Sequence, residues 1–424
     1  MTSANRLTRR AHRVPTIAVA VVAVAAVALA AACSGGSSGG GSKAAAEKTL
    51  GPTHVATGAP LKIGYVYDGS SAGIDNTSNL QAAQAAVKYV NNYLNGVAGR
   101  PLSLDVCSTN QTPAGAKTCV SQFVTDGVPI VLNGVTGQAA SLFAPLAKQG
   151  VPVFVDGSGD PASFSQPGID ILINGLVGLI GAPAALAKEA GVKLAAIAVI
   201  NVPAAVGAIK SAAPLFYGEY GVQTDIVAIP PGTPDASPQI DAALSRHPGQ
   251  FMVVGDTNLC QTVMKALGNA AFQGQQVAYS GCITPESSKQ LTNVAGTYVY
   301  PGQIDTGDSR TVAVYNAAMD LYAPSGYDHA GASMADYQAV VGFVEATEGL
   351  HGQVTKASIQ QAIHSMPPKP MPLMPGVTFQ CNKKQFPIAK NICSIDVLQA
   401  RLDASGSPTN YEVFSGKTLL TGKV

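Results

Sequence analysis

Six of the seven cysteines in this chain fall into three local couples, and paired thiols are the clearest chemistry that residue spacing suggests. The couples are Cys107 with Cys119, Cys260 with Cys282, and Cys381 with Cys393. Outside the cytosol, couples of this kind are more often disulfides than free thiols. No C-x-x-C spacing occurs and no histidine stands near a cysteine at zinc-ligand spacing, so no metal site is expected. The cysteine pattern therefore predicts three disulfides and an exported protein.

Cys33 is the remaining cysteine, and the residues before it also indicate export. Residues 17–32 are all apolar, and four arginines but no acidic residue precede them. A basic head, an apolar stretch and small residues at a cleavage point are typical of a secretory signal. A cysteine directly after the small residues resembles the bacterial lipoprotein signal. In that family Leu, Val or Ile usually stands three places before the cysteine, where this chain has Ala30, with Leu29 one place further back. The resemblance implies removal of residues 1–32 and a lipid anchor on Cys33.

Two other interpretations of this N-terminus are open. A membrane-spanning anchor needs roughly 20 apolar residues, and the run at 17–32 is shorter. Arg9 and Arg10 form the pair that twin-arginine export uses, but the residues around them do not fit that signal. After the signal, residues 33–60 are rich in Gly, Ser and Ala, so we expect a flexible tether there.

The charge of the chain excludes one class of partner. The chain has 26 basic residues, and removal of the four signal arginines leaves 22. With 25 acidic residues, the net charge of the remaining chain is about −3. Nucleic-acid binding relies on clustered Lys and Arg, so we expect no nucleic-acid partner. About 390 residues remain after the signal, which is enough for two domains with real cores.

Two series of apolar runs separated by helix-period segments predict the fold class. Each series alternates strand and helix, as βαβ units of a parallel sheet do. The first series has strands at 61–67, 102–107, 129–134 and 151–157, with helices at 80–94, 114–126 and 138–150. The second has strands at 194–200, 224–230, 251–256 and 276–281. We therefore predict an α/β protein with two doubly wound parallel sheets.

The C-terminal third departs from this alternation. A strand is expected at 294–302 and helices at 309–322, 333–350 and 356–366. A proline-rich break follows at 367–376. From Val377 the tail is expected to form a β-ribbon that carries the last cysteine couple.

Small polar turns follow three strands of the first series, and they are the candidate ligand-binding positions. Carboxyl ends of parallel strands meet at one sheet edge, where open α/β proteins bind ligands. Free backbone N–H groups at a helix start favour an anion such as a ligand carboxylate. The same residue types also cap helices without any ligand, and that alternative is open. The candidates are Asp68, Ser70 and Ser71; Thr136, Gly137 and Gln138; and Asp156, Ser158 and Gly159.

Three segments together resemble the type I periplasmic binding proteins, and among these the branched-chain amino acid and amide-binding group of ABC transporters. The segments are LKIGYVYDGSSAG (61–73), AAQAAVKYVNNYLNGVAGRPLSL (82–104) and VLNGVTGQAASLFAPLAKQGVPVFVDGSGDP (131–161). The resemblance implies two lobes that are joined by three crossovers and close on a small ligand in the cleft between them. The first lobe would be 61–175 plus 303–370, and the second 176–302 plus 371–424. A monomer without a cofactor is expected.

The resemblance also implies roles for individual residues of the first lobe. In that family the turn after the third strand supplies hydroxyls to the ligand's carboxylate. Thr136 stands at this position here, with Gly137 where a second hydroxyl often stands. The turn after the fourth strand supplies backbone N–H groups and a small hydroxyl, a role that falls on Ser158 and Gly159.

The second lobe departs from the family pattern. Amino-acid binders commonly have an aromatic residue after its first strand, whereas this chain has Asn201 and, further on, Val206. They also present an acid after the last strand of that lobe, where this chain has Ser280. An ammonium buried without a counter-charge is costly. An acid elsewhere in the chain, at Asp68, Asp156 or Asp256 beside Thr257, could supply the counter-charge to a ligand ammonium. Otherwise the ligand is an amide, a small acid or an apolar metabolite.

No catalytic motif accompanies these turns. The chain has no G-x-S-x-G elbow and no Walker loop, and only a pair such as Asp68 with Asp156 could do acid–base chemistry. We therefore expect a binding protein and not an enzyme. The resemblance implies the lipid-anchored solute-binding subunit of an ABC importer on the extracytoplasmic face of a bacterial membrane, with permease and ATPase partners. The alternative is a cell-surface sensor or interaction lipoprotein with the same fold.

Overall fold

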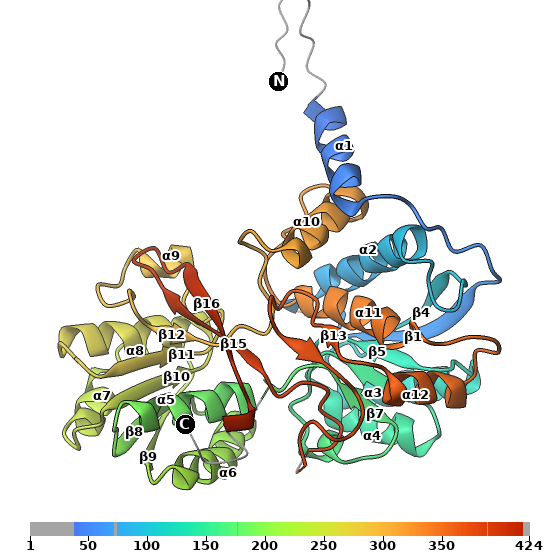
Figure 1. The fold of residues 1–424 in the computed structure, drawn as a ribbon. Helices are drawn as coiled ribbons and strands as arrows, with labels where there is room; N and C mark the ends of the chain where they lie inside the picture. The colour runs from blue at the N-terminus through green and yellow to red at the C-terminus, as the bar shows by residue number, and fades with distance from the viewer. Residues whose placement is uncertain (1–37, 72–73, 176, 388, 419–424) are drawn as a thin grey trace, which may run out of the picture. The chain divides into compact units, whose positions relative to one another are not determined.

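Two mainly parallel β-sheets organise the chain in the computed structural model, which describes residues 38–71, 74–175, 177–387 and 389–418 (Figure 1). The predicted signal sequence and Cys33 lie outside these residues. Among the described helices, none is both long and apolar enough to cross a membrane.

The first sheet has five parallel strands in the order β4-β1-β5-β6-β7. Its strands are apolar almost throughout, as expected of a parallel sheet covered on both faces. Strand β1 is buried along most of its length. The strands are β1 (Leu61–Tyr67), β4 (Leu102–Ser108), β5 (Val131–Asn133), β6 (Val153–Val155) and β7 (Ile169–Ile171). The first four match the prediction, and β7 was not predicted.

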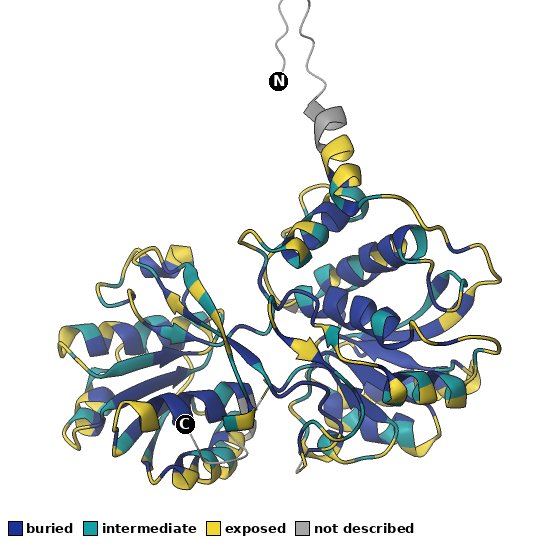
Figure 2. Ribbon diagram, in the orientation of Figure 1, coloured by how far each residue is buried: buried dark blue, intermediate teal, exposed yellow. Residues whose placement is uncertain are grey.

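Helices cover both faces of the first sheet. Successive side chains along each strand point to opposite faces, so each face offers apolar side chains for helices to pack against. Ile63 and Tyr65 of β1 pack in a cluster with α2, α10, α11 and α12, whereas Val66 packs with α3 and α4. Figure 2 shows these inward helix faces as buried. The helices are α2 (Thr77–Tyr93), α3 (Pro113–Thr125), α4 (Ala139–Lys148), α10 (Arg310–Tyr322), α11 (Met334–Ala346) and α12 (Lys356–Ser365).

The second sheet has seven strands in the order β16-β15-β12-β11-β10-β8-β9. Five of them are parallel, and β15 and β16 close one edge in antiparallel fashion. The strands are β8 (Leu194–Ile200), β9 (Gln223–Ile229), β10 (Gln250–Val254), β11 (Gln275–Ala278), β12 (Tyr298–Val299), β15 (Val397–Leu402) and β16 (Pro408–Phe414). The predicted second parallel sheet is therefore confirmed.

The second sheet is also covered on two sides. One cluster joins it to α5 (Ala182–Glu189) and α6 (Pro203–Glu219). The other joins it to α7 (Ser237–Leu244) and α8 (Thr257–Asn269). The remaining short elements are β2 (Ser70–Ser71), β3 (Ile74–Asp75), β13 (Lys369–Pro370), β14 (Thr378–Phe379), α9 (Pro285–Ser288), a 3-10 helix (Pro161–Phe164) and a π-helical turn (Val177–Gly181).

The predicted tether differs from the structure over residues 38–60. Helix α1 spans Ser38–Leu50, and Ala46 and Leu50 are buried in the cluster beneath the first sheet. Beyond the helix, the Ala56 N–H donates to the Asn91 carbonyl of α2 over 2.8 Å. The prediction of a flexible coil is wrong here because the Ala- and Lys-containing half of the segment favours helix and Leu50 finds an apolar partner.

Residues 371–393 also lie elsewhere than predicted. They were expected in the second lobe, yet Met371, Leu373 and Phe379 belong to the core cluster of the first sheet. The Cys393 N–H donates to the Ile171 carbonyl over 2.8 Å, so this segment runs along the edge strand β7. The chain returns to the second sheet only at β15, which makes its third passage between the sheets. The passage to the second sheet was predicted too early, at the proline-rich break. Proline ends a helix, but it does not determine which sheet the following residues join.

All three predicted disulfides are present in the structure, joining Cys107 to Cys119, Cys260 to Cys282 and Cys381 to Cys393. The first ties β4 to α3, and the second ties α8 to the turn after β11. The third closes the segment beside β7. Each bridge links elements that are near in sequence, as the local couples suggested.

Candidate functional site

The polar turns of the first sheet meet at its carboxyl edge. Strand β1 pairs with β4 on one side and with β5 on the other, and β5 pairs with β6. The turns after these strands therefore start side by side. Of the predicted positions, the structure brings Asp68, Thr136 and Gly137 into direct contact.

Asp68 is the centre of this contact. Its Oδ1 accepts hydrogen bonds from the hydroxyls of Thr109 and Thr136, each over 2.7 Å. Its Oδ2 accepts from the Gly137 N–H over 2.8 Å. The carboxylate is half-buried and ties together the turns after three neighbouring strands, β4, β1 and β5.

The start of the turn after β5 depends on two residues that were not predicted as site residues. Asn133 is fully buried, and its side-chain amide donates to the Val66 carbonyl over 2.9 Å. A Cβ at Gly134 would lie 2.4 Å from Oδ1 of Asp336. Only glycine permits this close approach, and the Gly134 N–H donates to the same oxygen over 2.9 Å.

Asp336 is a functional candidate that the sequence did not indicate. It lies on α11, is fully buried and accepts a hydrogen bond from the Tyr65 hydroxyl over 2.8 Å. Burial raises the pKa of Asp336 to about 8, although hydrogen bonds from Tyr65 and Gly134 oppose the rise. An acid in the first turn of the apolar helix predicted at 333–350 was the available signal.

Asp156 is a second buried acid at the same edge, with only 2% of its surface exposed. The Gln303 side chain donates to its Oδ2 over 2.9 Å, and its Oδ1 has no hydrogen-bond partner in the described structure. Burial, together with the nearby charge of Asp336, raises the pKa of Asp156 well above its ordinary value. The neutral, protonated form of Asp156 is therefore favoured relative to an ordinary aspartate, and in that form the side chain can donate a hydrogen bond.

The other predicted residues of the first sheet lie around these acids. The Ser158 hydroxyl accepts from the Asp160 N–H over 3.1 Å, and Gly159 is exposed beside it. The Gln138 N–H donates to the Thr136 hydroxyl oxygen over 3.0 Å. Ser70 and Ser71 form strand β2, which pairs with β3 and so leaves the sheet edge.

In the second sheet, the predicted positions follow strands β8, β10 and β11. Asp256 is the N-cap of α8, where its Oδ1 accepts from the Leu259 N–H over 2.8 Å, and Thr257 begins that helix. Asn201 is exposed after β8, and Ser280 is half-buried after β11. Val206 packs against the cluster between the sheet and α6.

Tyr279 is an aromatic residue that the sequence analysis missed. It directly follows β11, at the carboxyl edge of the second sheet, and 48% of its surface is exposed. Among the described residues, six large hydrophobic side chains are exposed, and Tyr279 is the one aromatic ring in that set. The sequence did contain a signal, because Tyr279 is the aromatic residue of the predicted strand 276–281 and directly precedes Ser280.

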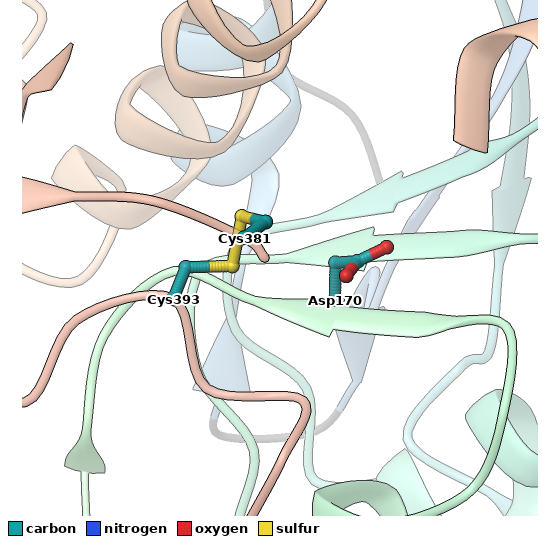
Figure 3. Close-up of side chains that lie close together, drawn as sticks. All are labelled: Asp170, Cys381 and Cys393. Atoms are coloured by element: carbon teal, nitrogen blue, oxygen red, sulfur yellow. A yellow bond between two sulfur atoms is a disulfide. The ribbon is translucent and has the colours of Figure 1, made fainter. Parts of the chain in front are cut away.

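One group of metal-capable side chains occurs among the described residues, formed by Asp170, Cys381 and Cys393 (Figure 3). The two sulfur atoms are bonded to each other, and a disulfide sulfur is not the thiolate that binds metals. Asp170 is already neutralised, because the Lys383 ammonium lies 2.5 Å from its Oδ1. These contacts make the group a structural anchor for the segment beside β7.

A hollow of about 780 Å³ lies at the opposite edge of the second sheet. Lys193, Gln223 and Gln275, at the amino ends of its strands, line it. Arg246, also in the lining, is paired with Asp225. The hollow is distinct from the carboxyl edge, where the polar turns lie.

Comparison with known proteins agrees with the fold. A family model described as periplasmic binding protein matches residues 60–390. An ABC transporter substrate-binding protein from Sphaerobacter thermophilus superposes with a TM-score of 0.68 at 16% identity, covering 84% of this chain and 98% of that chain. No curated protein sequence matches the chain.

Two further solved structures were determined with ligands bound. An R. palustris solute-binding protein in complex with 4-hydroxybenzoate has a TM-score of 0.65 at 16% identity, covering 84% of this chain and 97% of that chain. A branched-chain amino acid transporter substrate-binding protein from Streptococcus pneumoniae, in complex with isoleucine, has a TM-score of 0.61 at 17% identity, covering 84% and 99%. At these identities the likeness shows the fold alone.

The matched family consists of substrate-binding proteins and not of enzymes, and it implies an extracytoplasmic location and small-molecule ligands. The two parallel sheets with three passages between them are the type I architecture of that family. The chain belongs to the periplasmic binding protein family.

Proposed function

We propose that this protein is the solute-binding subunit of an ABC importer, anchored through a lipid on Cys33, and that it delivers a small ligand to a permease. The observation that carries the proposal is the pair of parallel sheets whose strands end in polar turns at their carboxyl edges. Ligands of open α/β sheets bind at that edge. The match of residues 60–390 to the family model supports the same assignment.

Binding would proceed by closure of the two lobes. A ligand that contacts both lobes only in the closed state shifts the equilibrium toward that state by its differential affinity. In the first lobe the contacts would come from Asp68, Asp156 and Ser158. In the second they would come from Ser280 and Tyr279, whose exposed ring would cover an apolar part of the ligand.

A ligand screen followed by calorimetry tests this proposal. The purified protein without its signal would be melted with branched-chain amino acids, their amides, 4-hydroxybenzoate and 4-hydroxybenzamide. A ligand at 100 times its Kd stabilises the folded state by about 2.7 kcal/mol, which a melting curve detects. No stabilisation by any compound of a broader metabolite set would contradict a solute-binding role.

Matched variants test whether both lobes hold the ligand. Ser158→Ala and Tyr279→Ala should each weaken binding at least tenfold, while Ser121→Ala and Leu215→Ala should leave it unchanged. The control residues are exposed on α3 and α6, away from the strand ends. If only one of the two site variants weakened binding, closure of both lobes onto a shared ligand would be ruled out. Uptake of the identified ligand by cells that lack the protein distinguishes an importer from a sensor, because only an importer is required for uptake.

A further inference from the structure

Asp68 fills the place that the family resemblance assigns to the carboxylate of the ligand. The resemblance implies that the hydroxyl of Thr136 and the backbone of its turn hold that carboxylate. In the structure, the Thr136 hydroxyl and the Gly137 N–H both donate to Asp68, over 2.7 and 2.8 Å. The side chain of the protein itself therefore occupies these donors.

The donors cannot serve two carboxylates at once. A threonine hydroxyl has one hydrogen to donate, and so has a backbone N–H. Thr136 uses its oxygen as well, since it accepts from the Gln138 N–H over 3.0 Å. The Thr109 hydroxyl donates to Asp68 from the other side over 2.7 Å. A ligand carboxylate would have to break these bonds and then lie beside a like charge, which is unfavourable.

The surroundings of Asp68 add to this effect. Asp156 and Asp336 are buried at the same sheet edge, and each interacts electrostatically with a neighbouring acid of this group. The side-chain oxygens of the three acids have hydrogen-bond partners in the described structure that carry no positive charge: Thr109, Thr136, Gly137, Gln303, Tyr65, Gly134 and Asn79. Oδ1 of Asp156 has no partner in the described structure, although the residue is only 2% exposed.

We propose that the ligand presents no carboxylate to the first sheet. Instead it contacts Asp68 and Asp156 through an uncharged or cationic group, such as an amide or an ammonium, that donates or accepts hydrogen bonds. This inference rests on the proposed solute-binding function and restricts its ligand class. It also accounts for the missing acid in the second lobe, because the first lobe supplies the negative charge.

Pairs of compounds that differ only at the carboxylate test the inference. The probes are L-leucine against L-leucinamide and 4-hydroxybenzoate against 4-hydroxybenzamide, titrated calorimetrically into the wild type, Asp68→Ala and Thr136→Val. We expect an amide to bind the wild type at least tenfold more tightly than its acid. Asp68→Ala should reverse this preference, because it frees the Thr136 hydroxyl and the Gly137 N–H. If Asp68→Ala does not fold, as judged by circular dichroism, Asp68→Asn replaces it: Asn removes the negative charge but keeps one acceptor oxygen, so it should reduce the preference for the amide without reversing it.

Two results would overturn the inference. The first is that an acid binds the wild type at least as tightly as its amide does, and binds Thr136→Val at least tenfold more weakly. The proposed solute-binding function would remain valid after that result. If no probe binds the wild type, the Asp68 variants decide: new binding of an acid supports the inference, and continued absence of binding refutes it. Failure of the proposed function is a separate outcome, seen when the broader metabolite screen finds no ligand.

Discussion

The Tyr65 hydroxyl donates a hydrogen bond of 2.8 Å to Oδ1 of Asp336, which lies 271 positions later in the chain. It joins strand β1 to helix α11, and Gly134 donates to the same oxygen from the turn after β5. Both side chains are fully buried. This bond fixes the helix against the strand ends from which the candidate site is built.

Tyr65→Phe should lower the free energy of unfolding by about 1–3 kcal/mol, because a buried acceptor loses a partner. Tyr67→Phe is the matched control, since Tyr67 lies on the same strand and is only half-buried. Guanidinium unfolding of the two variants measures the difference. Equal stabilities would show that the bond to Asp336 contributes nothing net.

Asp336→Asn should flatten the pH dependence of stability. The folded-state pKa of Asp336 is raised by burial to about 8, above the value of about 4 for an unfolded Asp. The folded state therefore holds more protons between these values, so stability is highest at low pH and falls as pH rises toward 8, by up to about 1.4 kcal/mol per unit. Asparagine keeps the oxygen that Tyr65 and Gly134 contact and cannot ionise. Its melting temperature should thus exceed that of the wild type at pH 8 and approach it only at about pH 4 or below, where Asp is protonated in both states.

The exposed Asp241 on α7 provides the control for that experiment. Asp241→Asn should follow the wild-type pH profile. The half-buried Glu345, whose pKa is raised to about 8 by desolvation, should leave a residual slope in Asp336→Asn. A profile of Asp336→Asn identical to the wild type would show that Asp336 does not change its protonation on unfolding.

Lys383→Met should destabilise the protein by about 1–3 kcal/mol, because the buried Asp170 would lose its ammonium partner and keep only the contact with His364, 3.2 Å from its Oδ1. Asp170 is 1% exposed, and Lys383 also donates to the Ile169 carbonyl over 2.7 Å. The neighbouring Lys384 is exposed, so Lys384→Met should change stability by less than about 0.5 kcal/mol. Chemical denaturation of both variants checks the prediction, and a small loss in Lys383→Met would contradict a structural role for this ion pair.

Leu50→Ala tests whether α1 is part of the folded domain. Leu50 is 8% exposed and packs in the core cluster of the first sheet, so truncation should cost about 2–5 kcal/mol. The exposed Lys48 lies on the same helix, and Lys48→Ala should have little effect. If Leu50→Ala melted like the wild type, the segment would behave as the free tether that composition suggested.

Cys33→Ala should release the protein from the membrane fraction or block its processing, because the thiol would no longer be available for acylation. Cell fractionation and the mass of the N-terminal peptide measure this. The Cys107–Cys119 pair changed to Ser is the control, since loss of a structural bridge should alter stability without altering membrane retention. Unchanged retention and mass in Cys33→Ala would remove the basis for a lipid anchor.

Local sequence patterns were sufficient to predict most helices and strands and the three disulfides. The run 61–67, apolar except for the exposed Lys62, predicted β1 because a strand covered on both faces is apolar along most of its length. The cysteine couples were predicted because their partners are near in the sequence. By contrast, β7 is three residues long and gave no pattern of its own, and α1 was hidden by the Gly and Ser residues around it.

The sequence by itself determined two parallel sheets, the polar turns at their strand ends and the family to which the chain belongs. Tertiary structure alone decided what those turns do: it placed Asp68 on the donors of Thr136 and Gly137, and brought Asp336 from α11 beneath Gly134. The physical reason is that periodicity reports how each residue faces its own neighbours, whereas a hydrogen bond between distant segments depends on where the fold brings them together. The same limit explains why residues 371–393 were assigned to the wrong sheet.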